Sequence, residues 1–474
     1  MEALAEKDLS PPIAAAQPPR SLRGRFYSNA AWSIGGRLLS MGSVFATNVL
    51  LARNLSTAEF SAYVVAAAAA MFLAIPAALG APRVILRLIR EGVASNQPGI
   101  AVHSAWACLQ LVAATCAVLA IMFVAGVHFL DDADKWRAVR DYSLLVAAWF
   151  ALSASCVAVS HALQGFDDFR TAAMTGAKNG GLLPNAFSIM VLAIAVATGH
   201  LTLWLAIAVQ VVAQFFALVY ACAVLWRITR RRLLSPTPQA EELPPTEIRS
   251  LRWFFEESWP ILVIQLTSLG VAQVDVLLVS WLSADREIAA YAAVVRLYEL
   301  LGSAHVLAVA IAAPFISELY VTNQLQKLER MLRAIASMTA IPTLIVSATL
   351  LIAPEAALTY TYGPNFAFGA DALRIGVIGC SISVLSGTNA LVMIMTGQQR
   401  QLLRVSVAAG VLYLLVAPAM INAWSITGAA AASSAIYGTY NIIITLMIKA
   451  RMGIWTIPSF SPADYALAYR QIVR

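Results

Sequence analysis

Polar side chains recur along one face of the first apolar stretch of the chain. Ser33, Arg37, Ser40 and Asn48 follow Asn29 at helical spacing, so they share that face. Packing through small polar residues explains the serines, but not Arg37, about 12 Å into the stretch at 1.5 Å per residue. A guanidinium pairs with phosphate through two hydrogen bonds. We therefore expect these residues to line a water-filled, anion-binding cavity.

A second polar face lies on the stretch 259–282, where Gln265 and Asp275 share a helical face. A buried carboxylate in lipid costs several kcal/mol unless it has a partner. Arg296, with Glu299 one turn on, lies at a similar depth in the next stretch, so we expect an Asp275–Arg296 salt bridge. Three roles stay open: a fixed structural pair, a pair that opens in a working cycle, and an ion or proton site at the carboxylate.

Four further basic residues lie near the ends of apolar stretches. Arg83, Arg87 and Lys178 are candidates for recruiting an anion, although each also fits an interfacial residue whose charge reaches the membrane surface. Arg374 lies three residues into its stretch and fits either an outer gate or such an interfacial residue. We group Arg374 with Asp275, Arg296 and Glu299 as candidates for gating or ion coupling.

The composition is that of an integral membrane protein. Of the 474 residues, 60% are hydrophobic and 12% are charged, with a mean hydropathy of +0.74. Soluble domains have about 25% charged residues, so this chain has too little polar surface to face water on all sides. The five cysteines lie in apolar stretches without metal-site spacing, so we expect no metal and no cofactor.

Apolar stretches long enough to cross a membrane recur along most of the chain, so we expect an all-α membrane protein of about twelve spans in two pseudosymmetric six-helix bundles. The first six spans are predicted at 30–52, 60–82, 102–126, 142–163, 179–198 and 202–226. The second six are predicted at 259–282, 288–313, 334–353, 371–396, 403–421 and 428–448.

The distribution of Lys and Arg predicts the orientation. With the N-terminus inside, basic residues favour the inner segments by roughly five to one, so both termini are expected to be cytoplasmic. This accounts for the net charge of +7 without nucleic-acid binding. The predicted organisation is a disordered tail at 1–28, a bundle at 29–226, a cytoplasmic linker at 227–258, a bundle at 259–448 and a tail at 449–474.

The two halves resemble each other in sequence. Trp32 corresponds to Trp259, and LSTAEFSAYVV (55–65) corresponds to LSADREIAAYAAVV (282–295) with one inserted residue. Because each half contains an even number of spans, the repeats are predicted to be parallel, related by an axis along the membrane normal.

The sequence resembles the polysaccharide flippases of the multidrug/oligosaccharidyl-lipid/polysaccharide exporter superfamily. The resemblance rests on LLARNLSTAEFSAYVVA, VDVLLVSWLSADREIAAYAAVVRL, APFISELY and YGPNFAFGADALRIGVIGC with a later MTGQQR, and it covers about 30–450. It implies a V-shaped alternating-access exporter fold. It also implies export of undecaprenyl-diphosphate-linked oligosaccharide to the outer leaflet of a bacterial inner membrane, with Arg37 as the best candidate to bind the diphosphate.

The resemblance also implies partners. They are the lipid-linked glycan, membrane lipids, a polysaccharide polymerase and co-polymerase, and H⁺ or Na⁺ as a coupling ion. An ion-coupled drug exporter and a lipid II flippase share the superfamily and stay open as alternatives. A membrane-embedded polymerase or transferase is an alternative of another class. The outer loops are short, and the chain contains no Walker motif, HExxH or GxSxG, so we predict no catalytic residue.

Overall fold

The computed structural model describes residues 22–94, 97–129, 136–176, 181–234, 251–266, 271–303, 305, 316, 319–320 and 322–459. The first half consists of α1 (Leu22–Asn54), α2 (Thr57–Ala78), α3 (Ala81–Ala94), α4 (Pro98–His128), α5 (Arg137–Asp141), α6 (Ser143–Gly165), α7 (Phe169–Thr175), α8 (Leu182–Ala197) and α9 (Leu203–Leu234). Helix α1 begins inside the segment that we expected to be a disordered tail.

The second half consists of α10 (Leu251–Gln265), α11 (Val271–Leu282), α12 (Asp285–Leu301), α14 (Leu325–Ile352), α15 (Pro354–Thr361), η4 (Pro364–Gly369), α16 (Ala370–Leu385), α17 (Asn389–Met395) and α18 (Gln399–Met452). Helix α18 contains the last two predicted spans, separated by a kink at Trp424 and Ser425. Each predicted span therefore corresponds to at least one helix, but several spans are broken.

The breaks occur where the backbone of another element comes close. Between α2 and α3, Gly80 has a φ of +70°, and a Cβ at this position would lie 2.6 Å from the carbonyl oxygen of Ser258 in α10. Between α16 and α17, a Cβ at Gly387 (φ +71°) would collide with the carbonyl oxygen of Thr456. Thr456 donates to the carbonyl oxygen of Ser386 (2.8 Å), so the segment after α18 docks at this break. Glycine is required because both the backbone conformation and the space exclude a side chain.

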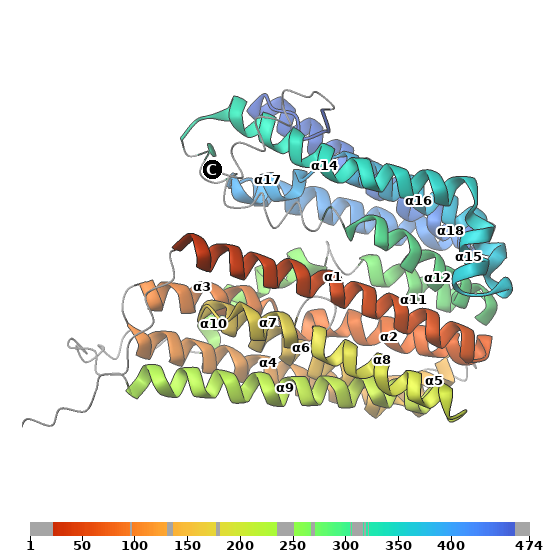
Figure 1. Ribbon diagram of the computed structural model, residues 1–474, viewed down its shortest axis with the longest axis horizontal. Coiled ribbons are helices and arrows are strands. Elements are labelled where there is room, and N and C mark those ends of the chain that lie inside the picture. Colours follow the sequence, from red (N-terminus) through yellow and green to blue (C-terminus); the bar gives the residue numbers. More distant parts are fainter. Residues whose placement is uncertain are drawn as a thin grey trace, which may run out of the picture.

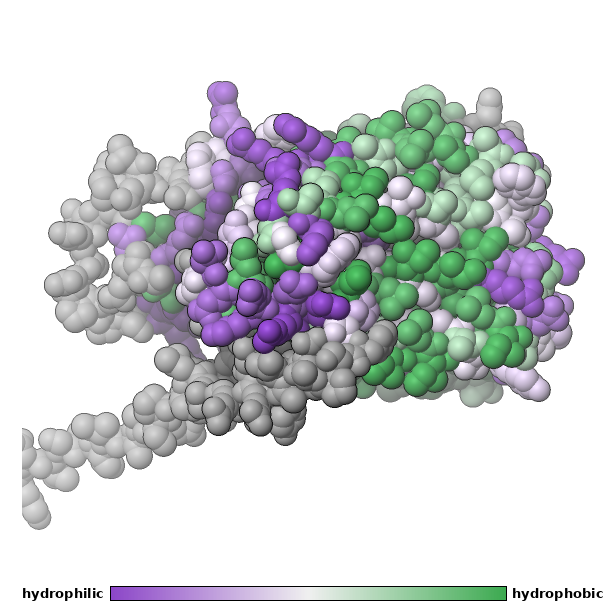
Figure 2. Space-filling model, turned by 90° about the horizontal axis from the view of Figure 1, so that it is seen from above, coloured by the Kyte–Doolittle hydropathy of each residue, from purple (hydrophilic) through white to green (hydrophobic). Residues whose placement is uncertain are grey.

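Among the described residues, seven helices are long and apolar enough to cross a membrane, and the breaks shorten most of the others. Large exposed side chains such as Phe216, Ile345 and Leu415 are apolar, as lipid contact requires. Figure 2 shows apolar side chains gathered over the middle of the molecule and polar side chains at its two ends. This distribution is that of a protein with a lipid-facing belt.

The helices form two groups that meet mainly where α2 packs against α11 and α12 (Figure 1). In the first group, α6 is central and packs against α2, α3, α4 and α9. In the second group, α16 is central and packs against α12, α14 and α18. Helix α2 contacts both α11 and α12 of the second group. Helix α10 is an exception, because it follows the linker but packs against α3 and α4 of the first group.

Several contacts between the halves lie at the end that we predict to be outer. Phe60 packs against Phe366 with ring centroids 6.0 Å apart, and Phe45 packs against Tyr362 at 6.1 Å. Arg53, near the end of α1, donates from Nε to the carbonyl oxygen of Thr361 (2.8 Å) and from Nη2 to that of Tyr360. These carbonyls lie in the last turn of α15. The carbonyl groups of a last helical turn receive no hydrogen bond from within the helix and carry partial negative charge. Arg53 therefore caps a helix of the opposite half.

Replacing Arg53 with Ala is expected to open this outer contact in part of the population, because two charge-assisted hydrogen bonds across the halves are lost. We expect a shift of roughly fivefold in the ratio of open to closed molecules, with Arg53→Lys intermediate. Spin labels at Ala58 and Glu355, both exposed at this end, would report the change as longer distances in pulsed electron paramagnetic resonance. Identical distance distributions in all three proteins would show that Arg53 does not hold the halves together.

Candidate functional site

Arg37 presents a guanidinium on the surface of α1. Its side chain is exposed, and none of the described residues forms an ion pair with it. The neighbouring Gly36 faces α7 so closely that a Cβ there would lie 3.0 Å from the Cβ of Ala173. This close packing fixes the rotation of α1 about its axis. Arg37, the next residue, therefore lies outside the face of α1 that packs on α7.

Two further basic side chains accompany Arg37. Arg83 of α3 is also exposed, and both guanidinium groups are close enough to His161 of α6 to act on it electrostatically. The Nδ1 of His161 lies 2.8 Å from the carbonyl oxygen of Val157, which leaves Nε2 as its remaining polar atom. We call Arg37, Arg83 and His161 the basic cluster. It provides two permanent cations and one titratable group from three different helices. His161 was not among the predicted site residues, because a single histidine in an apolar stretch has no distinguishing pattern.

The other predicted anion-binding residues have different surroundings. Ser40 is fully buried and its hydroxyl has no hydrogen-bond partner among the described groups, whereas Asn48 donates to the carbonyl oxygen of Val44 in its own helix (2.9 Å). Arg87 forms ion pairs with Glu257 (2.6 Å) and Glu91 (3.6 Å). Arg87 therefore joins α3 to α10 and is not a free cation. The side chain of Ser33 and the whole of Lys178 lie outside the described residues.

The prediction that Gln265 and Asp275 share one helical face was wrong. Gln265 is the last residue of α10, and Asp275 lies in α11, which begins at Val271. Helix α10 packs on the first half, whereas α11 contacts both α18 of the second half and α2 of the first. The apolar run continues across the end of α10, so helical periodicity in the sequence did not reveal that the helix ends there.

Asp275 is buried among hydroxyl groups of the second half. Its side chain is 3% exposed, and Oδ2 accepts a hydrogen bond from the hydroxyl of Tyr291 (3.2 Å). Tyr413 and Ser433 of α18 also face this carboxylate. Oδ1 of Asp275 and the hydroxyl of Tyr413 have no hydrogen bond of good geometry within the described part of the chain. We call these four residues the carboxylate cluster. Its unused polar atoms leave capacity to bind a proton or a small cation.

The carboxylate cluster contains one acidic group, which limits the ligands that suit it. Within the described ranges, no three His, Cys, Asp or Glu side chains gather as a metal site would require. One carboxylate with hydroxyl oxygens suits a proton or a hard monovalent cation rather than a transition metal.

The predicted salt bridge between Asp275 and Arg296 was also wrong. Nη1 of Arg296 pairs with Oε2 of Glu299 at 2.7 Å, one turn along the same helix. Tyr291 faces Asp275, and five residues rotate an α-helix by about 140°, so Arg296 points elsewhere on α12. Equal depth in the membrane does not ensure contact. The sequence did not reveal which face of α12 turns toward Asp275.

Arg296 lies where the two halves meet. It lies near Tyr63 of α2 and near Tyr362, which packs against Phe45 of α1. The hydroxyl of Tyr63 accepts a hydrogen bond from Gln210 (3.3 Å). Arg374, by contrast, pairs with Asp371 at 2.6 Å on its own helix, and both side chains are largely exposed. Arg296 therefore lies close to residues that contact both halves, whereas Arg374 forms a local surface pair.

The internal repeat places corresponding polar groups at corresponding sites. Glu59 accepts a hydrogen bond from the backbone N–H of Ser56 (3.1 Å), and Glu287 accepts one from that of Ala284 (3.0 Å). The offset that relates Trp32 to Trp259 also relates Asn48 to Asp275. The carboxylate of the second half thus has an amide as its counterpart in the first half, so the two halves differ in charge at this position.

Solved structures of membrane transporters share this fold. An inward-facing multidrug resistance MATE family transporter of the MOP superfamily matches with a TM-score of 0.66 at 15% identity, over 87% of this chain and 94% of that one. An outward-facing conformation matches with a TM-score of 0.61 at 14% identity, over 91% and 96%. A MOP superfamily transporter from Pyrococcus furiosus, with a binding pocket described as having reverse polarity, gives the same four values. These similarities confirm the expected exporter fold.

Sequence comparison identifies the family. No curated protein matches the chain significantly. The profile of a family described as polysaccharide biosynthesis protein matches residues 26–320, which is more than half of the chain. The protein therefore belongs to the polysaccharide biosynthesis protein family, and its fold is that of the MOP superfamily transporters.

Proposed function

We propose that this protein transfers undecaprenyl-diphosphate-linked oligosaccharide from the inner to the outer leaflet of a bacterial cytoplasmic membrane. The observation that carries the proposal is the basic cluster, in which Arg37 is exposed and has no ion pair with any described residue. An unneutralised guanidinium at membrane depth is costly and calls for an anionic ligand. Within a polysaccharide biosynthesis family, a lipid diphosphate carrying a glycan provides that anion.

Alternating access supplies the mechanism. The contacts of Arg53, Phe45 and Phe60 hold the halves together at the predicted outer end, and the TM-score is higher for the inward-facing relative than for the outward-facing one. In this conformation the basic cluster receives the diphosphate from the cytoplasmic leaflet. Breaking the outer contact and closing the inner end then exposes the glycan to the other side. The ion pair of Arg87 with Glu257 lies near the inner end and has to adapt to this movement.

The charge of the first half favours an anionic substrate over a cationic drug. Arg37 and Arg83 would repel a cation, and the carboxylate that a cationic drug needs lies buried in the second half. The Pyrococcus furiosus relative provides a precedent, because the reverse polarity of its pocket is described as suggesting a different function. One fold thus accommodates pockets of opposite charge.

The carboxylate cluster is our candidate for energy coupling. Asp275 lies on α11, which contacts α18 of the second half and α2 of the first, and Tyr413 and Ser433 on α18 face it. Binding of a proton or sodium ion at Asp275 neutralises the buried charge and changes the contact between α11 and α18. The amide at Asn48 cannot take part in such a cycle, so of these two corresponding positions we assign coupling to Asp275 in the second half.

Replacing Arg37 with Ala is expected to weaken binding of an undecaprenyl-diphosphate disaccharide at least about tenfold, because a charge-assisted bidentate contact is lost. Arg37→Lys should retain part of the affinity, since it keeps the charge but not the fork. Equilibrium binding to purified protein in nanodiscs measures the effect. Arg90→Ala, which removes an exposed arginine already paired with Asp167 at 3.2 Å, is the matched control. Equal affinities for the Arg37→Ala and Arg90→Ala proteins would remove Arg37 from the substrate site.

Replacing Asp275 with Asn is expected to abolish stimulation of transport by a proton or sodium gradient while leaving substrate exchange without a gradient. The amide oxygen can still accept from Tyr291, so the fold should persist, but the site can no longer gain or lose charge. Proteoliposomes with each imposed gradient provide the measurement. Tyr291→Phe is the control, because it removes the hydrogen bond and keeps the carboxylate. Gradient stimulation that survives in the Asp275→Asn protein would exclude coupling at this residue.

A further inference from the structure

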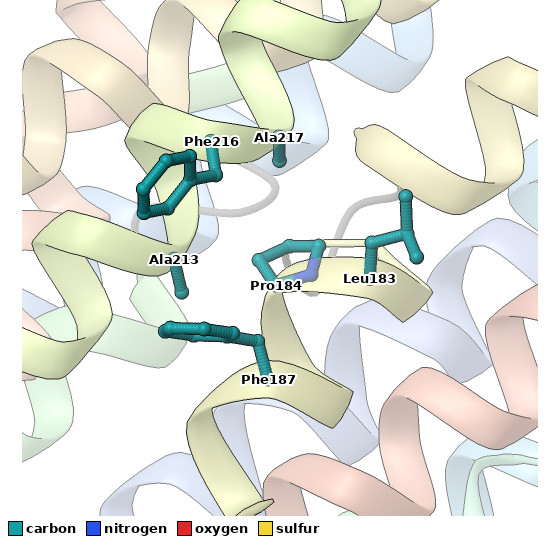
Figure 3. A pocket seen from close by; sticks show the side chains of 6 residues that line it. All are labelled: Leu183, Pro184, Phe187, Ala213, Phe216 and Ala217. Atoms are coloured by element: carbon teal, nitrogen blue, oxygen red, sulfur yellow. The ribbon is translucent and has the colours of Figure 1, made fainter. Parts of the chain in front are cut away.

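An apolar groove lies on the first half, between α8 and α9. It has a volume of about 350 Å³. Its lining side chains, shown in Figure 3, are Leu183, Pro184, Phe187, Ala213, Phe216 and Ala217. Ala213 and Ala217 lie one turn apart on α9, and their small side chains create the hollow. The rings of Phe187 and Phe216 pack against each other on one side of the groove, with centroids 6.1 Å apart (Figure 3).

The groove lies deep in the part of the molecule that faces lipid. Ala217 is close to the middle of α9, about 15 Å from Arg227 at 1.5 Å per residue. Large apolar side chains around the groove, including Phe215, Val219 and Met190, are at least half exposed. Water is absent at this depth and every side chain that lines the groove is apolar, so the groove suits a hydrocarbon occupant.

A series of close contacts connects the groove with the basic cluster. Gly36, next to Arg37, packs on Ala173 of α7. Gly176, just after α7, is so close to Cys156 of α6 that a Cβ would collide with its carbonyl oxygen. The thiol of Cys156 in turn lies 3.5 Å from the carbonyl oxygen of Gln214, which lies between two of the groove residues on α9. Residues of α7 and α6 therefore lie between the cluster and the groove.

We propose that this groove holds the prenyl chain of the substrate while the basic cluster holds its diphosphate. This inference rests on the proposed function. A polyprenyl diphosphate joins a doubly charged head to a long, methyl-branched chain, and the head and chain need different surroundings. Arg37 provides the charged site, and the hollow over Ala213 and Ala217 provides an apolar one that accepts methyl branches. The chain passes from the cluster to the groove along the surface of the first half and stays in the membrane while the glycan crosses.

Filling the groove tests the proposal. Ala217→Phe places a ring in the hollow, Ala213→Phe does so from the neighbouring turn, and Val219→Phe adds the same ring on the exposed side of α9 as a matched control. Each protein is titrated in nanodiscs with the same disaccharide on undecaprenyl diphosphate and on farnesyl diphosphate. We expect both groove variants to bind the undecaprenyl probe about tenfold more weakly, because several methylene groups lose their contacts, and to bind the farnesyl probe like the wild type.

The outcomes separate this inference from the proposed function. Unchanged binding of the undecaprenyl probe by both groove variants, or an equal loss for both probes, would overturn the groove assignment. The Arg37→Ala substitution should weaken the binding of both probes by about the same factor. If the wild type binds neither probe, the proposed function fails and the groove assignment fails with it.

A photoreactive residue provides a measurement that does not depend on affinity. With p-benzoylphenylalanine at position 216, illumination should attach the undecaprenyl probe to the protein, and Arg37→Ala should reduce the yield. Attachment of bulk phospholipid with no probe captured would show that the groove holds ordinary membrane lipid, and would also overturn the proposal.

Discussion

A charged group inside a membrane requires a partner, a ligand or water, and this constraint explains how the polar residues of the chain are arranged. Asp275 is surrounded by hydroxyl groups of Tyr291, Tyr413 and Ser433. Arg296 is neutralised by Glu299 on the same helix. Arg37 is satisfied in neither way, because it is exposed and unpaired within the described residues. The cost of leaving this cation without a counter-ion is what a bound anion would offset.

The two halves share one structural plan but differ in the charge of corresponding residues. Both retain the acidic residue that accepts a hydrogen bond at the start of the second helix, Glu59 in one half and Glu287 in the other. Both also retain a buried tyrosine one turn further on, Tyr63 and Tyr291. They differ where Asn48 corresponds to Asp275, and where the first half contributes the basic cluster. We infer that the first half handles the substrate and the second half handles the coupling ion.

Sequence patterns predicted the large-scale features of this protein and missed those that depend on helix rotation. Span positions follow from apolar length, which the bilayer fixes, whereas the exporter fold was implied by the resemblance to the polysaccharide flippases. The pairing of Arg296 depends on which face of α12 meets α11, and apolar residues surround that helix on several sides, so no periodicity revealed it. The end of α10 at Gln265 lies in an apolar run that looks continuous. The cap that Arg53 provides for α15 joins residues about 300 positions apart and has no local sequence signal.

Transbilayer movement of the lipid-linked glycan by the purified protein tests the central claim most directly. Proteoliposomes would contain a fluorescent undecaprenyl-diphosphate disaccharide, and a membrane-impermeant lectin added outside would quench the label that reaches the outer leaflet. The account predicts that quenching is much faster and more complete with the protein than in protein-free vesicles, and that inorganic diphosphate in the vesicle interior slows it by competing for the basic cluster. Quenching at the protein-free rate, with protein that retains its fold in the same vesicles, would contradict the account.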